Sequence, residues 1–224
     1  SMATIPGSNG NDLLNGTDDD DLIQGFEGND TIAGQGGNDT IEGGVGNDVI
    51  DGGSGDDLID AGSGNDIIRG GAGNDTIIGG GDNDNLQGGD GADTFIVNQF
   101  GTAGVNNTTV NGGSGGIDND TLNIAQLLKD GWVITNIIQN PENNGAPGFN
   151  GQIQLQRGAE FANINFSDIE RLVICFTPHT SLATPKGMRR VTELCPGDAV
   201  ITRDNGYQRV KWVGRRDLNK VDLM

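Results

Sequence analysis

The sequence is poor in the residues that build an ordinary hydrophobic core. Aromatic residues make up 4% of its 224 residues, and apolar residues make up 33%. No apolar run approaches the roughly 20 residues that a membrane-spanning helix needs. Two cysteines, Cys175 and Cys195, are too few for a disulfide framework. With 40 glycines and a net charge of −19, such a composition predicts disorder, unless a charged ligand supplies the stabilisation that burial does not.

Basic residues are almost missing from the first part of the chain. Residues 1–96 hold 20 acidic side chains and one basic side chain, Arg69, which gives a net charge of −19. The whole chain holds 32 acidic and 13 basic side chains, so residues 97–224 hold 12 of each. An acidic surface repels the phosphates of nucleic acid, so we expect no nucleic-acid partner and favour a divalent cation. We also expect no N-terminal signal peptide, because Ala3 and Thr4 lead directly into the glycine-rich region.

The glycine-rich region repeats with a period of nine residues, in ten consecutive units over residues 7–96. The sixth position of every unit is aspartate: Asp12, Asp21, Asp30, Asp39, Asp48, Asp57, Asp66, Asp75, Asp84 and Asp93. The eighth position is always large and apolar: Leu14, Ile23, Ile32, Ile41, Ile50, Ile59, Ile68, Ile77, Leu86 and Phe95. The fourth position is glycine except at Asp19 and Asp82. A flexible linker, the alternative interpretation, does not keep such a register.

Each unit is expected to fold as a glycine turn followed by a short strand. Glycine at positions one, two and four allows a positive φ, and positions seven to nine form a strand whose alternation turns position eight inward. Burial of one apolar side chain contributes roughly 2 kcal/mol, whereas ordering nine residues of backbone costs about 9–18 kcal/mol. Burial alone therefore does not hold such a fold together.

Calcium is the ligand that suits this pattern. Ca²⁺ takes six to eight oxygen ligands from carboxylates and backbone carbonyls. We expect two units to make one coil, so that each unit stacks on the next unit but one and the position-six aspartates form two columns. Carboxylates stacked roughly 4.8 Å apart repel each other unless a cation lies between them.

The repeat Gly-Gly-x-Gly-x-Asp-x-apolar-x resembles the RTX (haemolysin-type) calcium-binding repeat family over residues 7–96. The resemblance implies an all-β fold, a parallel β-roll, in which each ion lies between stacked turns and takes carboxylate oxygens from both. Four gaps in each column imply about eight Ca²⁺ ions. The resemblance also implies carbonyl ligands from positions one to four, best matched at Gly34, Gly36, Gly37, Gly43, Val45, Gly46, Gly52, Ser54, Gly55, Ala61, Ser63, Gly64, Gly70, Ala72 and Gly73.

The same resemblance implies a route and a trigger for folding. Proteins of this family leave the cell by type I secretion, which uses no N-terminal signal, so we expect a secreted, extracellular protein. Low calcium inside the cell would keep the chain unfolded, and millimolar calcium outside would fold it. The first two units, the second of which has Asp19 at position four, and the ninth unit, with Asp82, are expected to be weaker calcium sites than those of residues 34–75.

Residues 97–174 break the period and are expected to form a β-rich cap or linker at the open end of the roll. Residues 112–120 resemble one more repeat with two extra residues, which makes Asp118 and Asp120 candidate ligands of a further ion. Residues 122–128 predict a short helix, and the apolar residues between 132 and 138 and those between 152 and 156 predict strands. Further apolar mass comes from Phe161, Ile164, Phe166, Ile169, Leu172 and Val173.

Residues 175–224 follow a different pattern, which starts at Cys175 and includes Thr184-Pro185-Lys186-Gly187 and Leu194-Cys195-Pro196-Gly197-Asp198-Ala199-Val200. This resembles the first part of a Hint (hedgehog/intein) domain, an all-β self-processing module. The resemblance implies that the Cys175 thiol attacks the carbonyl carbon of Ile174 and converts that peptide bond into a thioester. The family also needs a histidine from a later motif, but the sole histidine here is His179. We therefore expect a partial, inactive module in which Cys175 is a small buried residue.

Three functions follow from these patterns. The first is a secreted calcium-binding module that folds on binding Ca²⁺, fused to a Hint processing domain. The second is an autoproteolytic protein that cleaves between Ile174 and Cys175, with the roll as a passenger; the missing histidine motif argues against it. The third, a surface adhesin or ice-binding roll, would require threonine at position three of the turns, and none of the ten units has it.

Overall fold

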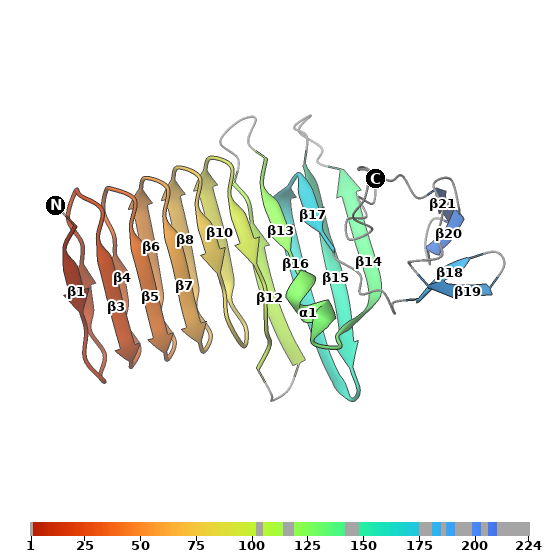
Figure 1. The fold of residues 1–224 in the computed structure, drawn as a ribbon, viewed down its shortest axis with the longest axis horizontal. Coiled ribbons are helices and arrows are strands. Elements are labelled where there is room, and N and C mark those ends of the chain that lie inside the picture. Colours follow the sequence, from red (N-terminus) through yellow and green to blue (C-terminus); the bar gives the residue numbers. More distant parts are fainter. Residues whose placement is uncertain are drawn as a thin grey trace.

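The computed structural model describes residues 2–101, 105–113, 119–141 and 148–174, and four later strands between residues 181 and 209. Two sheets run along the long axis of the molecule (Figure 1). The chain winds from one sheet to the other and back, and each complete coil adds one strand to each sheet. The predicted parallel β-roll is confirmed.

The first sheet has eight strands, all parallel to their neighbours. In spatial order they are β1 (Thr4–Pro6), β3 (Leu22–Glu27), β5 (Thr40–Val45), β7 (Leu58–Ser63), β9 (Thr76–Ile78), β11 (Thr94–Ile96), β13 (Thr121–Asn123) and β17 (Arg171–Val173). The roll thus begins one strand before the first nine-residue unit, because β1 pairs with β3.

The second sheet has nine strands and changes from parallel to antiparallel pairing near its C-terminal end. In spatial order they are β2 (Leu13–Asn15), β4 (Thr31–Ala33), β6 (Val49–Ser54), β8 (Ile67–Ala72), β10 (Asn85–Asp90), β12 (Val105–Asn111), β16 (Glu160–Ile169), β15 (Phe149–Arg157) and β14 (Val133–Pro141). The antiparallel strands β14, β15 and β16 are longer than any strand of the repeats.

Two units make one coil, as the spacing predicts. Ile23 pairs with Ile41, and Ile41 pairs with Ile59, so strands two units apart are neighbours. Position eight forms the inner row, and none of its ten side chains is more than 8% exposed. The strands differ from the prediction in length: β3, β5, β6, β7, β8 and β10 have six residues each, because the ladder continues through positions one to three of the next unit.

Glycine has two different roles in the turns. At positions two and four it adopts a positive φ from the third unit onward, as at Gly44 (110°) and Gly46 (141°). The non-glycine residues Phe26 (75°) and Gln35 (77°) adopt the same conformation at position two, where a Cβ is sterically disfavoured. Position one was expected to need a positive φ as well, and this is wrong. Glycine is favoured there because a Cβ would make close contacts, described with the site below.

Beyond the repeats, a cap completes both sheets. The predicted strands near residues 132–138 and 152–156 are β14 and β15. The predicted helix is shorter and later than expected: α1 spans Ala125–Lys129, and Leu122 belongs to β13 instead. Phe161 was assigned to the buried apolar mass, but it is 50% exposed, because the alternation along β16 turns Ala162, Ile164 and Phe166 inward.

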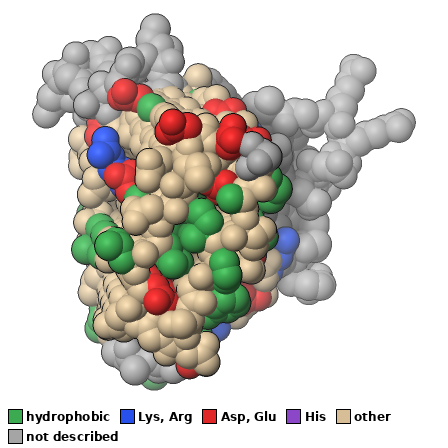
Figure 2. Space-filling view, turned by 90° about the vertical axis from the view of Figure 1, so that its left-hand side faces the viewer, with side chains coloured by type: hydrophobic (Ala, Val, Ile, Leu, Met, Phe, Trp, Pro, Cys, Tyr) green, Lys and Arg blue, Asp and Glu red, His purple; other side chains and the backbone are tan. Residues whose placement is uncertain are grey.

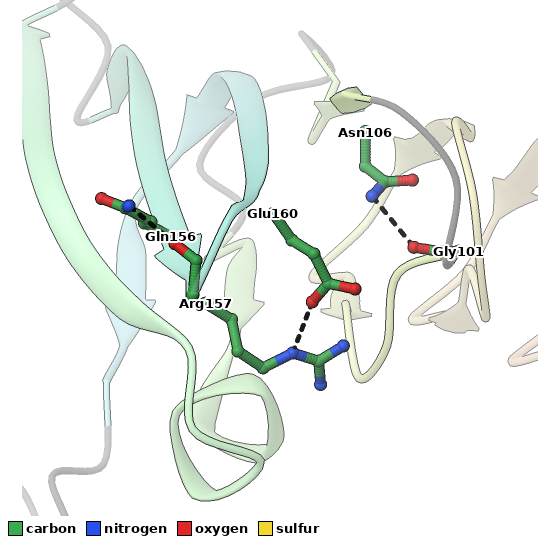
Figure 3. A network of polar contacts seen from close by, with 6 residues as sticks. Gly101, Asn106, Gln156, Arg157 and Glu160 are labelled. Atoms are coloured by element: carbon green, nitrogen blue, oxygen red, sulfur yellow. Dashed lines mark hydrogen bonds and ion pairs between the residues drawn. The ribbon is translucent and has the colours of Figure 1, made fainter.

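Aromatic packing closes the cap around Trp132, which is 3% exposed. The rings of Phe100 and Trp132 meet edge to face at 5.0 Å, and the guanidinium of Arg157 lies 4.8 Å from the Trp132 ring centre. Figure 3 shows Arg157 reaching Glu160 through a 2.8 Å ion pair, and Asn106 donating to the Gly101 carbonyl at 3.2 Å. These contacts tie the turn between β15 and β16 to the residues that follow β11.

The last described elements are two antiparallel hairpins. Strand β18 (Ser181–Thr184) pairs with β19 (Gly187–Arg190), and β20 (Ala199–Thr202) pairs with β21 (Gly206–Arg209). The candidate nucleophile Cys175, together with His179 and Cys195, lies outside the described residues. Among the described residues the helix α1 is far too short to cross a membrane.

Candidate metal centre

The position-six aspartates form the two predicted columns, one at each side of the roll. From Asp21 to Asp93, one carboxylate oxygen of each, Oδ1, accepts a hydrogen bond from the backbone N–H of the residue one coil earlier. The Asp39 N–H donates to Asp57 Oδ1 at 2.8 Å, and the Asp48 N–H donates to Asp66 Oδ1 at 2.8 Å. Nine of these side chains, from Asp21 to Asp93, are at most 3% exposed, whereas Asp12 at the end is half-buried. The turns therefore stack with their carboxylates inside.

The second carboxylate oxygen, Oδ2, is buried and accepts no hydrogen bond in the middle of both columns. This holds for Asp30, Asp39, Asp48, Asp57, Asp66 and Asp75. A buried carboxylate oxygen without a partner is costly, because the charge has lost water and gained nothing in return. A cation between the turns would supply that partner.

Where position one is glycine, the aspartate Oδ2 of the same turn lies close to it. A Cβ added at Gly52 would lie 2.5 Å from Asp57 Oδ2 and 2.6 Å from the carbonyl oxygen of Gly70, in the next turn of the column. At Gly43 the same point lies 2.8 Å from Asp48 Oδ2 and 2.5 Å from the Ala61 oxygen. Position one therefore leaves little space for a side chain, which agrees with glycine in nine units and the small Ala61 in the other, and the space is lined by carboxylate and carbonyl oxygens. Such hard oxygen donors fit Ca²⁺.

Electrostatics give the same picture of an interior that lacks positive charge. Burial raises the pKa of Asp57 and of Asp66 to about 7 and that of Asp84 to about 8, although a backbone N–H donated to each carboxylate opposes the shift. Burial also raises the pKa of Asp39, Asp48 and Asp75. The neutral form is thus favoured wherever no cation balances the carboxylate.

The carbonyl groups of residues 34–75 divide into three sets. Those of position one, such as Gly34, Gly52, Ala61 and Gly70, face the turn before them and lie near its aspartate Oδ2 or position-one glycine. Those of position three serve the sheet: the carbonyls of Val45, Ser63 and Ala72 accept backbone N–H groups of the preceding coil, each at 2.8 Å. Position-four carbonyls, including those of Gly37, Gly46 and Gly55, stack against the position-four glycine of the next coil.

Sequence reasoning missed a second ladder, at position five. The Asn47 N–H donates to Asn29 Oδ1 at 2.7 Å, and the Asn65 N–H donates to Asn47 Oδ1 at 2.8 Å. This ladder runs opposite to the aspartate ladder, because here the earlier residue accepts and the later one donates. The signal was present, since position five is Asn or Asp in every unit except the last, which has Ala92. These side chains hold the turns in register from the outside.

Sequence reasoning also missed how one column ends. The Asp93 N–H donates to Asp120 Oδ1 at 2.7 Å, and the Asp120 N–H donates to Glu170 Oε2 at 2.7 Å. The candidate Asp120 therefore continues the column, and Glu170 closes it, whereas the alternative candidate Asp118 lies outside the described residues. The sequence separation between Asp93 and Asp120 differs from that between Asp120 and Glu170, and neither equals the repeat interval. A sequence search with a fixed period therefore does not find this continuation of the column.

No group of three or more Asp, Glu, His or Cys side chains gathers at one point within the described part of the chain. This agrees with the architecture, because a gap between two stacked turns brings two aspartates together at most. An ion there would have to take the rest of its oxygen ligands from the backbone.

The fold and the site define a repeat solenoid whose stacked turns enclose carboxylates. Comparison with known families then identifies the repeats: residues 6–41, 34–68 and 60–95 match the RTX calcium-binding nonapeptide repeat. Residues 174–224 match the Hint domain. The chain thus carries a region of RTX calcium-binding repeats followed by a Hint-family segment, and both resemblances drawn from the sequence are confirmed.

Similarity to whole proteins is more distant. The crystal structure of the extracellular lipase LipA from Serratia marcescens is 19% identical to this chain, with a TM-score of 0.22. The match covers 73% of this chain and 37% of the lipase chain, so this chain spans little more than a third of that protein's length. No curated protein matches the sequence.

Proposed function

We propose that this chain is a calcium-binding module whose roll folds when Ca²⁺ binds between its stacked turns. The observation that carries the proposal is the set of buried Oδ2 atoms without hydrogen-bond partners, each beside the carbonyl-lined space over position one. About eight ions, one for each gap between repeat turns, would bring about +16 of charge to a region of net charge −19. No other group in the repeats offers comparable compensation, since Arg69 is their single basic residue.

Residues of the chain orient the carboxylates in the gap between two stacked turns. Backbone N–H groups hold Oδ1 of each aspartate, as the Asp39 N–H holds Asp57, so that Oδ2 is left facing the space over position one. A bound Ca²⁺ would supply the positive charge that this space lacks. Because ions would bind the stacked turns and not the unfolded chain, each site would stabilise the fold by RT ln(1 + [Ca²⁺]/Kd).

Secretion is part of the proposal. An RTX repeat region that folds only in calcium can remain unfolded at low intracellular calcium and fold outside the cell, where calcium is millimolar. We propose accordingly that the chain is secreted by a type I-like route. Residues 7–96 would be the calcium-dependent unit, residues 97–174 its cap, and residues 175–224 the start of the processing module.

The test is folding with and without the ion. Far-ultraviolet circular dichroism of the chain should show a disordered spectrum in EGTA and a β spectrum in millimolar Ca²⁺, with Mg²⁺ at equal concentration as the control for ionic strength. The variant Asp57→Asn keeps the shape and removes one buried charge, and it should need more calcium for the same signal. A β spectrum of equal strength in EGTA and in calcium would refute the proposal.

Self-cleavage is the second candidate function, favoured by a Hint match that begins at Ile174, next to Cys175. We expect the chain to stay intact, because thioester chemistry needs a proton donor to the leaving amine and His179 stands outside the family's motif. Intact mass after incubation with dithiothreitol or hydroxylamine tests this. A single species of 23.2 kDa favours the calcium-binding module alone. A fragment ending at Ile174 that is absent from Cys175→Ala favours cleavage.

A further inference from the structure

The first turn of each column differs from the turns that follow. At position two, Ser8 and Thr17 keep a negative φ, whereas all eight later units have a positive φ there. A later turn lies on the turn before it, as Gly44 lies against the carbonyl of Phe26, where an added Cβ would clash. No such turn precedes the first one in each column, because β1 and β2 are the edge strands of the two sheets. Position two is therefore free to carry a side chain at this end.

Figure 2 shows this end of the roll, with apolar side chains over its middle and acidic side chains scattered around them. The exposed apolar residues Met2 and Leu13 belong to its first strands or precede them. The end is thus the outermost layer of the solenoid, where water and not another turn faces the backbone of position two. Ser8 and Thr17 are both exposed there.

The side chains of Ser8 and Thr17 donate hydrogen bonds to the position-six carboxylate of their own turn. Ser8 donates to Asp12 Oδ2 through its backbone N–H at 2.6 Å and its hydroxyl at 2.9 Å. Thr17 makes the same pair of hydrogen bonds to Asp21 Oδ2, at 2.7 and 2.9 Å. In the six aspartates from Asp30 to Asp75 of both columns, the same atom is buried and accepts no hydrogen bond. The aspartate Oδ2 thus accepts hydrogen bonds in the first turn of each column and accepts none in the middle turns. The residue at position two determines which of these environments it has.

We infer that Ser8 and Thr17 close the first turn of each column with a hydroxyl and an N–H in place of a cation, and that calcium binding within the repeats starts at Asp30 and Asp39. The inference rests on the proposed function and refines it. It reduces the expected ions within the repeats from about eight to about six, one for each unpartnered Oδ2. It also gives the roll an N-terminal layer that needs no cation.

The chemistry of the two donors supports this assignment. Two hydrogen bonds to one carboxylate oxygen occupy the lone pairs that a cation would use, and a hydroxyl on that oxygen takes up the space beside it. Later units have glycine at this position, apart from Phe26 and Gln35, whose side chains lack a hydroxyl. Units three to eight therefore have no internal donor of this kind.

The experiment counts bound calcium by equilibrium dialysis with ⁴⁵Ca²⁺ at saturation, in the full chain. Asp21→Asn and Asp57→Asn are matched variants, since both change position six of the same column. We expect Asp57→Asn to lose one or two ions and Asp21→Asn to lose none. Loss of an ion in Asp21→Asn as large as that in Asp57→Asn would overturn the inference while leaving the proposed function intact. A chain that binds no calcium at all would overturn the proposed function instead.

A second variant keeps the test decisive if Asp57→Asn does not fold. Replacing both Ser8 and Thr17 by glycine gives the first two turns the position-two residue of the calcium-binding ones. We expect up to two additional ions for each chain, with Thr109→Gly, which removes an exposed hydroxyl side chain from β12, as the control that adds none. An unchanged count in the double variant would contradict the idea that the hydroxyls keep calcium out.

Discussion

The repeats and the cap share two sheets but are held together by different means. A coil of the repeats buries two apolar side chains, one for each unit, and two carboxylates beside them. The cap instead packs Trp132, Phe100, Ile153, Leu155 and Ile164 around longer antiparallel strands. The difference shows that a continuous ladder of backbone hydrogen bonds does not determine what stabilises each part. The side chains enclosed between the sheets decide whether the interior needs a cation.

The largest expected effect comes from the apolar core of the cap. Phe166→Ala removes a ring that is 4% exposed and should lower the free energy of unfolding by about 3–5 kcal/mol in saturating calcium. Phe161→Ala is the matched control, because Phe161 lies on the same strand and is 50% exposed. Urea denaturation of both variants measures the difference. Equal losses would show that the cap is not stabilised by the inward face of β16.

Removal of a carboxylate should have different effects in the repeats and in the cap. Asp66→Ala removes one buried ligand from the middle of a column and should raise the calcium midpoint of folding by roughly tenfold, equivalent to ~1.4 kcal/mol. Asp130→Ala removes an exposed carboxylate that accepts a hydrogen bond from Gln126 in the cap, and it should leave the midpoint unchanged. Calcium titration followed by circular dichroism gives both values. A shift of the same size in both variants would count against ions held by the columns.

Acid should partly replace calcium in the repeats. Because burial raises the pKa of Asp57 and Asp66 to about 7 and of Asp84 to about 8, the folded chain binds protons more tightly than the unfolded chain. The stability from these groups is fully present below the unfolded pKa near 3.8 and is lost as pH rises through 7 to 8. In calcium-free buffer the β signal should therefore be stronger at pH 5 than at pH 8. The reverse order would contradict the buried, uncompensated carboxylates.

The smallest effect is expected at the surface of the cap. Arg157 and Glu160 form an ion pair whose side chains are 38% and 35% exposed. Such pairs contribute about 0–1 kcal/mol, so Glu160→Gln should lower the melting temperature only slightly and leave the calcium midpoint unchanged. Differential scanning calorimetry at low and high salt checks this. A loss comparable to that of Phe166→Ala would mean that the Trp132 cluster depends on the ion pair.

The repeating parts of the fold could be predicted from the sequence, whereas the structure beyond the last repeat was predicted less well. Position six and position eight follow from a fixed interval, and so do the two columns and the inner row. The role of position-one glycine did not follow, because the crowding near Gly52 comes from the carboxylate of Asp57 and a carbonyl in the next turn. Phe161 was wrongly assigned to the buried residues. The pairing of β16 determines which face of the strand is buried, and it places Ala162 and Ile164 inside and Phe161 outside. Glu170 joins the column only through tertiary alignment.

Because one coil consists of two units, the length of the roll can change only by whole coils. Strands of the repeats pair at an interval of two units, and consecutive units belong to opposite sheets. Removal of residues 43–60, which are two whole units, would shorten the roll by one coil and return every later strand to its own sheet. Removal of a single unit would transfer each later strand to the opposite sheet and present the cap to the wrong edges. Growth or loss of such a roll is therefore expected in steps of two units, and a comparison of calcium-induced folding in the two deletions would reveal that step.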